Sequence, residues 1–247
     1  MRMIGFRGVR GGVGTTSVVA MVAQALHQSG QRVLMVDLNP SDMLRLHFNV
    51  RFEETAGWAS AGINGQAWNE QAFQIDDGLT LLPFGRFGCP QAHDPALDDT
   101  SLMGAVTDLQ WLDELTRLRK QPDWILLDVA HDWPASGVLN TLTDLQVLIA
   151  SVDAGCHIRL CQHRFRKGWR LLANMQDPSR DLCNDLLTDW TGRFHEMLLP
   201  VVISRDESIH EALAMKTCVG RAFPQSSGSG DAKALATWLQ LHVRERR

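Results

Sequence analysis

The sequence predicts an α/β fold in which a doubly wound, mainly parallel sheet is flanked by helices. Short apolar segments alternate with longer amphipathic ones along the 247 residues. Strands that alternate with helices favour parallel pairing through right-handed crossovers. Several apolar segments also lack the polar residue at every second position, which indicates that helices cover both faces of the strands. We therefore expect a single domain over residues 1–247.

The strands and helices follow from the length and pattern of these segments. Short apolar runs bounded by polar or turn-forming residues predict strands at residues 3–8, 32–38, 79–85, 123–130, 145–153, 169–175 and 198–204. Amphipathic stretches between them predict helices at residues 15–29, 99–120, 155–167, 179–194 and 206–216. The Gly-, Pro- and Asp-rich residues 85–98 predict a loop.

The C-terminal part is predicted to be a connector followed by a helix. Residues 224–231, PQSSGSGD, are rich in Gly and Ser, which indicates a flexible connector. The segment AKALATWLQLHVRERR follows and places Leu235, Trp238 and Leu239 on one stripe of a helix. A helix packed on the sheet is favoured over one that lies on a membrane surface.

The composition predicts a cytoplasmic protein. The net charge of −4 gives no overall basic field that would favour nucleic acid. The five scattered cysteines form no C-x-x-C pair, which fits reduced thiols better than disulfides or a zinc site. The N-terminus lacks the long apolar core of a signal peptide, and no run reaches the ~18 apolar residues of a membrane span. We therefore expect any membrane contact to be peripheral or through a partner.

Residues 8–17, GVRGGVGTTS, have the features of a phosphate-binding loop. Gly11, Gly12 and Gly14 lie between a predicted strand and a predicted helix. Glycines in this setting let successive backbone N–H groups turn toward a phosphate at the positive end of the helix. The strand–loop–helix context makes the signal stronger than a run of glycines alone.

The loop departs from the usual pattern G-x-x-x-x-G-K-[ST] at two positions. Gly14 and Thr16 match the second glycine and the hydroxyl residue that contacts the metal. Val9 replaces the first glycine, and Thr15 replaces the lysine. A threonine at that position keeps a hydroxyl and a backbone donor, but it brings no positive charge to the phosphates.

The segment VRGGVGTTS resembles the deviant Walker A motif of the MinD/ParA family of P-loop NTPases, K-G-G-x-G-K-[ST]. In that family an additional lysine at the start of the loop reaches the partner's phosphates in a nucleotide-held homodimer. Arg10 stands at that position and keeps a cation that can bind phosphate through two donors. The resemblance implies ATP and Mg²⁺ as ligands, with nucleotide contacts from Arg10, Gly11, Gly12, Val13, Gly14, Thr15, Thr16 and Ser17.

Two further segments resemble the parts of that family that organise the metal. VLMVDLNP resembles V-D-x-D-P, with Asp37 at the first aspartate. Asn39 stands at the second position, where the family has an aspartate that positions the attacking water. WILLDVAHD resembles the Walker B strand and places Asp128 near the metal. The resemblance therefore implies that Thr16, Asp37 and Asp128 organise Mg²⁺.

Two late segments resemble the parts of the family that surround the base. Asn174 in LLANMQD stands where the family reads the adenine edge with an asparagine, although an ordinary turn residue is an equal alternative. VVISRDES places Arg205 and Asp206 beside the base, with Ser204 where the family has proline.

These departures separate ATP binding from hydrolysis. Hydrolysis needs charge stabilisation at the γ-phosphate and an oriented water. Thr15 and Asn39 do not supply the usual lysine and carboxylate, so we assign no catalytic residue within one subunit. Arg10 of a partner subunit could act as an arginine finger. We expect tight ATP binding with slow or absent turnover.

Other segments resemble a branch of the family that assists bacterial cellulose synthesis. They are LRLHFNV, GWA, LLPFG and VDAGCHIRL. That resemblance implies a dimeric scaffold held by ATP, recruited to the inner membrane by BcsR, BcsE and the cellulose synthase complex. The alternative is an active ParA/MinD-type ATPase that positions DNA or a cell pole; the acidic balance, Thr15 and Asn39 argue against it. An iron–sulfur ATPase resembling the nitrogenase iron protein is disfavoured because VAHDWP, from the Walker B strand end, has no cysteine.

Overall fold

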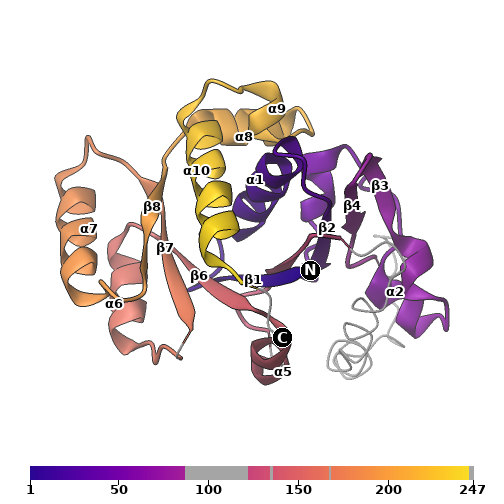
Figure 1. Ribbon diagram of the computed structural model, residues 1–247, viewed down its shortest axis with the longest axis horizontal. Coiled ribbons are helices and arrows are strands. Elements are labelled where there is room, and N and C mark those ends of the chain that lie inside the picture. The colour runs from indigo at the N-terminus through magenta and orange to yellow at the C-terminus, as the bar shows by residue number, and fades with distance from the viewer. Residues whose placement is uncertain (87–121, 134–135, 167, 245–247) are drawn as a thin grey trace.

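A mixed sheet forms the centre of the computed structural model, which describes residues 1–86, 122–133, 136–166 and 168–244. The eight strands lie in the order β3-β4-β2-β5-β1-β6-β7-β8 (Figure 1). Neighbouring strands are parallel except for the antiparallel pair β3 and β4. The predicted doubly wound, mainly parallel sheet is therefore confirmed.

All seven predicted strands are present. They are β1 (Arg2–Gly8), β2 (Val33–Leu38), β4 (Leu79–Leu82), β5 (Trp124–Val129), β6 (Leu145–Ser151), β7 (Trp169–Gln176) and β8 (Leu198–Ser204). Strand β3 (Phe73–Asp76) was not predicted. It is a four-residue edge strand with alternating half-buried and exposed side chains, and such a pattern is too short to stand out in the sequence.

The helices include the predicted ones that fall within the described residues, together with three that were not predicted, at residues 58–63, 136–142 and 219–222. They are α1 (Thr15–Gln28), α2 (Trp58–Ile63), α5 (Ser136–Leu142), α6 (Ala154–Gln162), α7 (Asp181–Arg193), α8 (Glu207–Ala214), α9 (Val219–Ala222) and α10 (Ser227–His242), with 3₁₀ turns η1 (Leu44–Phe48) and η2 (Trp68–Gln71). The predicted helices 15–29, 155–167, 179–194 and 206–216 correspond to α1, α6, α7 and α8, and α6 ends earlier than expected. The predicted helix at 99–120, Cys89 and most of the predicted loop at 85–98 lie outside the described residues.

The predicted connector at residues 224–231 is wrong in its second half, because α10 begins at Ser227. The Ser226 hydroxyl caps the helix by accepting a hydrogen bond from the Ser229 backbone N–H. The Asp231 carboxylate accepts a hydrogen bond from the Ser204 backbone N–H at 2.8 Å. Cap and tertiary contacts thus override the helix-breaking tendency of the Gly- and Ser-rich sequence.

Helix α10 packs on the sheet side, as the sequence predicts. Leu235 and Leu239 are fully buried, and the helix lies against α1 and β8 (Figure 1). None of the helices within the described ranges is long and apolar enough to cross a membrane.

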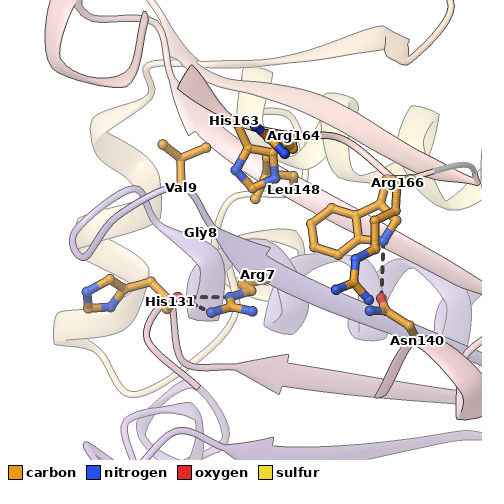
Figure 2. A pocket seen from close by; sticks show the side chains of 10 residues that line it. Arg7, Gly8, Val9, His131, Asn140, Leu148, His163, Arg164 and Arg166 are labelled. Carbon is orange, nitrogen blue, oxygen red and sulfur yellow. Dashed lines mark hydrogen bonds between the residues drawn. The ribbon is translucent and has the colours of Figure 1, made fainter. Parts of the chain in front are cut away.

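The side chains of β1 point alternately to the two sides of the sheet. Ile4 and Phe6 belong to the hydrophobic cluster that contains the buried face of α1. Met3 belongs to the cluster on the side of α5. Arg7 follows the alternation of Met3, and its guanidinium Nε donates to the His131 carbonyl at 2.8 Å (Figure 2). The two faces of β1 therefore differ: one packs against α1, and the other carries Arg7 near its end.

Candidate functional site

The loop between β1 and α1 forms a cradle of backbone N–H groups. From Arg10 to Ser17, none of them donates to a backbone carbonyl in the part of the chain described. Gly12 and Gly14 adopt left-handed φ angles of 74° and 81°, which glycine reaches without strain. The N-terminus of α1 adds its positive dipole end to the same point. The loop is therefore built to receive an anion.

Asn174 at the end of β7 supports this loop. Its side chain is buried, and its Nδ2 donates to the Val13 carbonyl at 2.7 Å while its Oδ1 accepts from the Met175 backbone N–H. A Cβ atom on Gly14 would lie 2.8 Å from the same Nδ2, so glycine is required there by space as well as by φ. Asn174 thus positions the loop, and its predicted contact with adenine stays a prediction.

A cavity of about 370 Å³ opens beside the loop and the first turn of α1. Its volume is within the range of about 300–1,000 Å³ found for small-molecule sites. The predicted base-side residues all line it, together with loop glycines: Gly12, Gly14, Ser17, Asn174, Arg205 and Asp206. Asp206 is fixed as the N-cap of α8 and accepts a hydrogen bond from the Gly228 backbone N–H at 2.8 Å. The structure therefore brings these distant segments together.

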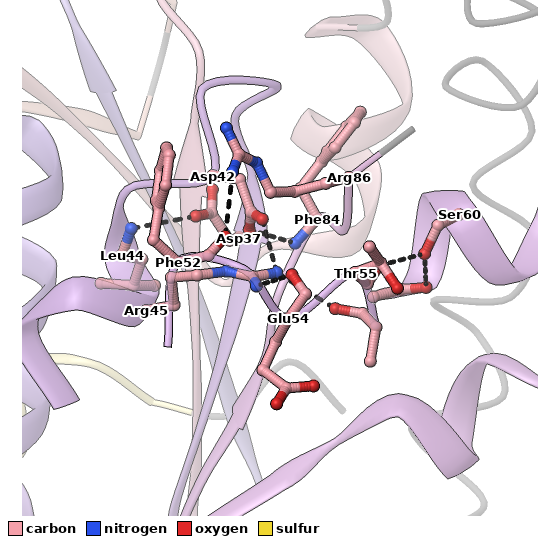
Figure 3. Close-up of polar contacts among 12 residues, drawn as sticks. Asp37, Asp42, Leu44, Arg45, Phe52, Glu54, Thr55, Ser60, Phe84 and Arg86 are labelled. Atoms are coloured by element: carbon pink, nitrogen blue, oxygen red, sulfur yellow. Dashed lines mark hydrogen bonds and ion pairs between the residues drawn. The ribbon is translucent and has the colours of Figure 1, made fainter. Parts of the chain in front are cut away.

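Two fully buried carboxylates lie side by side at the ends of β2 and β5. Asp37 and Asp128 are direct neighbours in the register of these strands. One oxygen of Asp37 accepts a hydrogen bond from the Asn39 backbone N–H at 2.9 Å. The other accepts from the Leu44 backbone N–H at 3.2 Å (Figure 3). Neither oxygen of Asp128 has a hydrogen-bond partner of normal geometry among the described residues.

Burial raises the pKa of both carboxyls. Burial raises the pKa of Asp128 to about 6, and the nearby Thr16 hydroxyl opposes this rise by lowering the pKa. The pKa of Asp37 lies well above its ordinary value, first because of burial and then because of the charges of Asp128 and Asp42. Each carboxylate therefore gains from a cation nearby.

The donor set fits Mg²⁺. The ion prefers oxygen ligands and takes one or two protein carboxylates with phosphates and water. Asp128 offers two buried oxygens without a normal partner, and the Thr16 hydroxyl lies next to them. Thr16, Asp37 and Asp128 are accordingly the residues that would hold the ion, whose charge would neutralise part of the phosphate charge.

Thr15 and Asn39 are the residues that replace the family's lysine and second aspartate. Thr15 is the first residue of α1, at the mouth of the cradle. Asn39 follows β2, and its side-chain oxygen accepts a hydrogen bond from the Ser41 backbone N–H at 3.1 Å. This side chain closes a turn and offers no carboxylate. The site therefore keeps the means of binding phosphate, but it lacks a lysine and a second aspartate at these positions.

Arg10 lies at the start of the loop and is held within its own subunit. Its Nη2 contacts Asp153 Oδ2 at 2.7 Å, and its Nη1 donates to the Gly11 carbonyl at 2.8 Å. The other oxygen of Asp153 caps α6 by accepting from the Cys156 backbone N–H. About a third of each charged side chain is exposed. Asp153 was not predicted, although an aspartate between an apolar strand and a helix is a typical N-cap signal.

Comparison with known proteins identifies the family. The model of the family described as "Cellulose biosynthesis protein BcsQ" matches residues 1–239. The chain belongs to the BcsQ family. A BcsQ protein of Salmonella typhi is 37% identical over 98% of this chain and 95% of its own length. This membership favours the cellulose-synthesis expectation over the ParA/MinD-type ATPase alternative.

Solved structures confirm the MinD/ParA-like fold. The septum site-determining protein MinD of Pyrococcus horikoshii, complexed with Mg-ADP, superposes with a TM-score of 0.71 at 18% identity, covering 100% of this chain and 99% of its own. Cobyrinic acid a,c-diamide synthase of Mycobacterium smegmatis, with a bound ATP analogue and magnesium, gives 0.68 at 21% identity, covering 100% and 97%. At these identities the likeness concerns the fold.

In this BcsQ-family chain, a buried ion pair lies next to Asp37 (Figure 3). Arg45 of η1 is fully buried, forms an ion pair with Asp42, and donates to the backbone carbonyls of Glu54 and Ala56. The other oxygen of Asp42 accepts from the Phe84 backbone N–H at 3.1 Å. The pair therefore ties the segment after Asp37 to the end of β4. The segment LRLHFNV had no structural explanation in the sequence, because all these contacts are with residues outside it.

Proposed function

We propose that this chain is an ATP-binding accessory protein of bacterial cellulose synthesis and secretion that acts as a nucleotide-held dimeric scaffold. The observation that carries the proposal is the position of Arg10. This cation lies at the start of the loop whose backbone N–H groups form the cradle, and one partly exposed carboxylate, Asp153, holds it. When ATP fills the cradle of a facing subunit, Arg10 leaves Asp153 and binds the partner's phosphates. ATP thereby holds the two subunits together.

The binding site is assigned residue by residue. The loop from Arg10 to Ser17 holds the phosphates, and Asn174, Arg205 and Asp206 lie around the base. Thr16, Asp37 and Asp128 hold Mg²⁺. Structures of proteins with the same fold that contain Mg-ADP or an ATP analogue with magnesium support ATP and Mg²⁺ as the ligands.

Hydrolysis is slow or absent in this proposal. A loose phosphoryl-transfer transition state needs positive charge and a positioned water. Thr15 and Asn39 give neither in their usual form. Arg10 of the partner subunit is the one cation proposed to reach the phosphates as an arginine finger. Its main role is to stabilise the dimer, and any slow turnover depends on it as well.

Family membership supports a proposal for the partners. BcsR and BcsE bind the dimer, and they bring it to the cellulose synthase complex at the inner membrane. The chain itself is cytoplasmic and reaches the membrane through these partners. BcsQ-family membership over residues 1–239 supports this assignment.

Variants of the Arg10–Asp153 pair test the dimer. Arg10→Ala should weaken the ATP-dependent dimer about tenfold or more, since hydrogen bonds to charged groups contribute about 1.5–3 kcal/mol. Asp153→Asn keeps the α6 cap but removes the charge that holds Arg10, so the ATP-dependent dimer should become a few times tighter, within the ~1 kcal/mol of a partly exposed pair. Sedimentation velocity with and without ATP measures both.

Arg159→Ala is the matched control, because Arg159 is an exposed arginine on α6 outside the pair. It should dimerise with ATP like the unaltered chain. Dimerisation of Arg10→Ala at unaltered strength would exclude the proposed role of Arg10.

A further inference from the structure

A second cavity, rich in basic side chains, lies on the Arg7 side of the sheet, away from α1. It has a volume of about 420 Å³ and lies between the end of β1, α5 and the connection from α6 to β7 (Figure 2). The side chains that carry the argument are Arg7, His131, His163, Arg164, Arg166 and Trp169. None of the residues that the structure assigns to its wall is acidic. The cavity is distinct from the one that Asn174 and Asp206 line.

Arg7 is fixed in the cavity by backbone carbonyl groups, and none of the described carboxylates forms an ion pair with it. Its Nε and Nη2 donate to the His131 carbonyl, and Nη2 also lies 3.4 Å from the Trp133 carbonyl. Burial lowers the pKa of Arg7, and the acidic group that counteracts this is Asp132, whose side chain is 75% exposed. Neutral carbonyl groups thus orient a partly buried cation whose charge is not matched inside the cavity.

The opposite wall comes from residues 163–166. Arg164 and Arg166 are exposed, and Arg166 projects into the same space as Arg7 (Figure 2). Burial, and then the charge of Arg7, lower the pKa of His163. Positive groups from two distant segments therefore converge, which distinguishes this cavity from an ordinary solvated basic surface.

One part of the cavity is aromatic. The His163 ring lies 4.9 Å from Phe165 and 5.8 Å from Trp169, measured between ring centroids. Trp169 is held in place by a hydrogen bond from its Nε1 to Asn140 Oδ1 at 3.1 Å. A ligand here therefore meets cations at one end and flat apolar surface at the other.

We propose that this cavity binds a phosphomonoester. Arg7, Arg164 and Arg166 contact the phosphate, because guanidinium groups match phosphate oxygens through paired donors and a dianion suits several converging cations better than a monoanionic carboxylate. His163 and Trp169 pack against the organic part, for which the volume leaves room. This site is additional to the nucleotide site and borders it, since Gly8 and Val9 at the start of the phosphate loop also line the cavity.

Calorimetry on the full chain saturated with Mg-ADP tests the proposal, because ADP then occupies the loop. The probes are phenyl phosphate, inorganic phosphate and benzoate. Phenyl phosphate should bind most tightly, and Arg164→Glu/Arg166→Glu should weaken it about tenfold or more. Arg159→Glu/Arg180→Glu makes the same change of charge at exposed sites outside the cavity and should leave binding unaltered.

The result that overturns the proposal is equally specific. Benzoate binding as tightly as phenyl phosphate would show a carboxylate site, and equal binding of inorganic phosphate would remove the organic part of the ligand. Unaltered affinity in Arg164→Glu/Arg166→Glu would also exclude it. Phenyl phosphate binding that is seen only without Mg-ADP would show that it occupies the loop, which leaves the proposed nucleotide site intact while this proposal fails.

Histidine NMR supplies a second readout that does not depend on affinity. A bound dianion should raise the pKa of His163 by on the order of one unit relative to chloride at equal ionic strength. The resonance is assigned by its loss in His163→Asn. An unchanged pKa of His163 in saturating phenyl phosphate would place the ligand elsewhere.

Discussion

Asp128→Asn should make the metal-free protein more stable at about pH 7.5 while abolishing its stabilisation by Mg²⁺ with nucleotide. Burial raises the pKa of Asp128 from 3.8 to about 6, so ionising it in the folded state costs free energy. A difference of this size corresponds to about 3 kcal/mol at most. The amide keeps the shape of the side chain without the charge, so the carboxylate that we propose for Mg²⁺ is lost.

The sign of the pH dependence follows from the same pKa. Between pH 3.8 and about 6 the folded state binds more protons at Asp128 than the unfolded state does. The metal-free protein therefore loses stability as the pH rises through this window, and the loss is complete above it. Asp37 acts in the same direction because its pKa is also raised.

Thermal unfolding at about pH 5 and about pH 7.5, with and without Mg²⁺ and ATP, measures this prediction. For a chain of this length, about 1 kcal/mol shifts the melting temperature by about 2–4 °C, so Asp128→Asn should raise it by several degrees at the higher pH. Asp77→Asn, at an exposed carboxyl, is the control. Lower stability of Asp128→Asn at the higher pH, with the metal effect retained, would contradict the assignment of Asp128.

Arg45→Met should destabilise the protein by about 3–5 kcal/mol, because it leaves the buried Asp42 without its cation. Arg45 is fully buried and its guanidinium also satisfies two backbone carbonyls, so methionine cannot replace its contacts. Burial raises the pKa of Asp42, and the Arg45 charge opposes this. Removing Arg45 therefore raises that pKa further.

A double variant separates the effect of the buried Asp42 charge from the effect of lost packing. Asp42→Asn/Arg45→Met removes both charges and keeps an acceptor for the Phe84 backbone N–H. It should be less destabilised than Arg45→Met alone, as measured by urea unfolding. Arg51→Met, at a side chain that is 76% exposed, should stay within about 0.5 kcal/mol. Equal destabilisation by the single and double variants would show that the buried charge of Asp42 is not the cause.

The fold could be predicted because its signals are local. Strands such as β2 and β5 are buried along their whole length and are therefore apolar except at Asp37 and Asp128. The strand–loop–helix arrangement around the proposed phosphate loop could be predicted because three glycines stand between a strand and a helix. The start of α10 could not, since Ser226 and Asp231 act through caps and tertiary hydrogen bonds.

The parts of the site that escaped prediction depend on distant pairs. Arg10 was assigned from its place in a motif, but its partner Asp153 lies 143 residues away in the sequence. The basic cavity joins Arg7 to residues 163–166, and no sequence pattern connects them. Asn174 was singled out by resemblance, whereas its hydrogen bond to the Val13 carbonyl depends on where β7 lies relative to the loop.

The proposed site should hold ATP without turning it over at an ordinary rate. The direct measurement is to denature the purified protein, identify the released nucleotide, and follow phosphate release and oligomeric state with ATP. We expect intact ATP in a dimer, with phosphate release far below about one per second. Thr15→Lys/Asn39→Asp, which restores both missing charges, should release phosphate faster. Steady release by the unaltered chain near or above about one per second would exclude a site that only holds ATP.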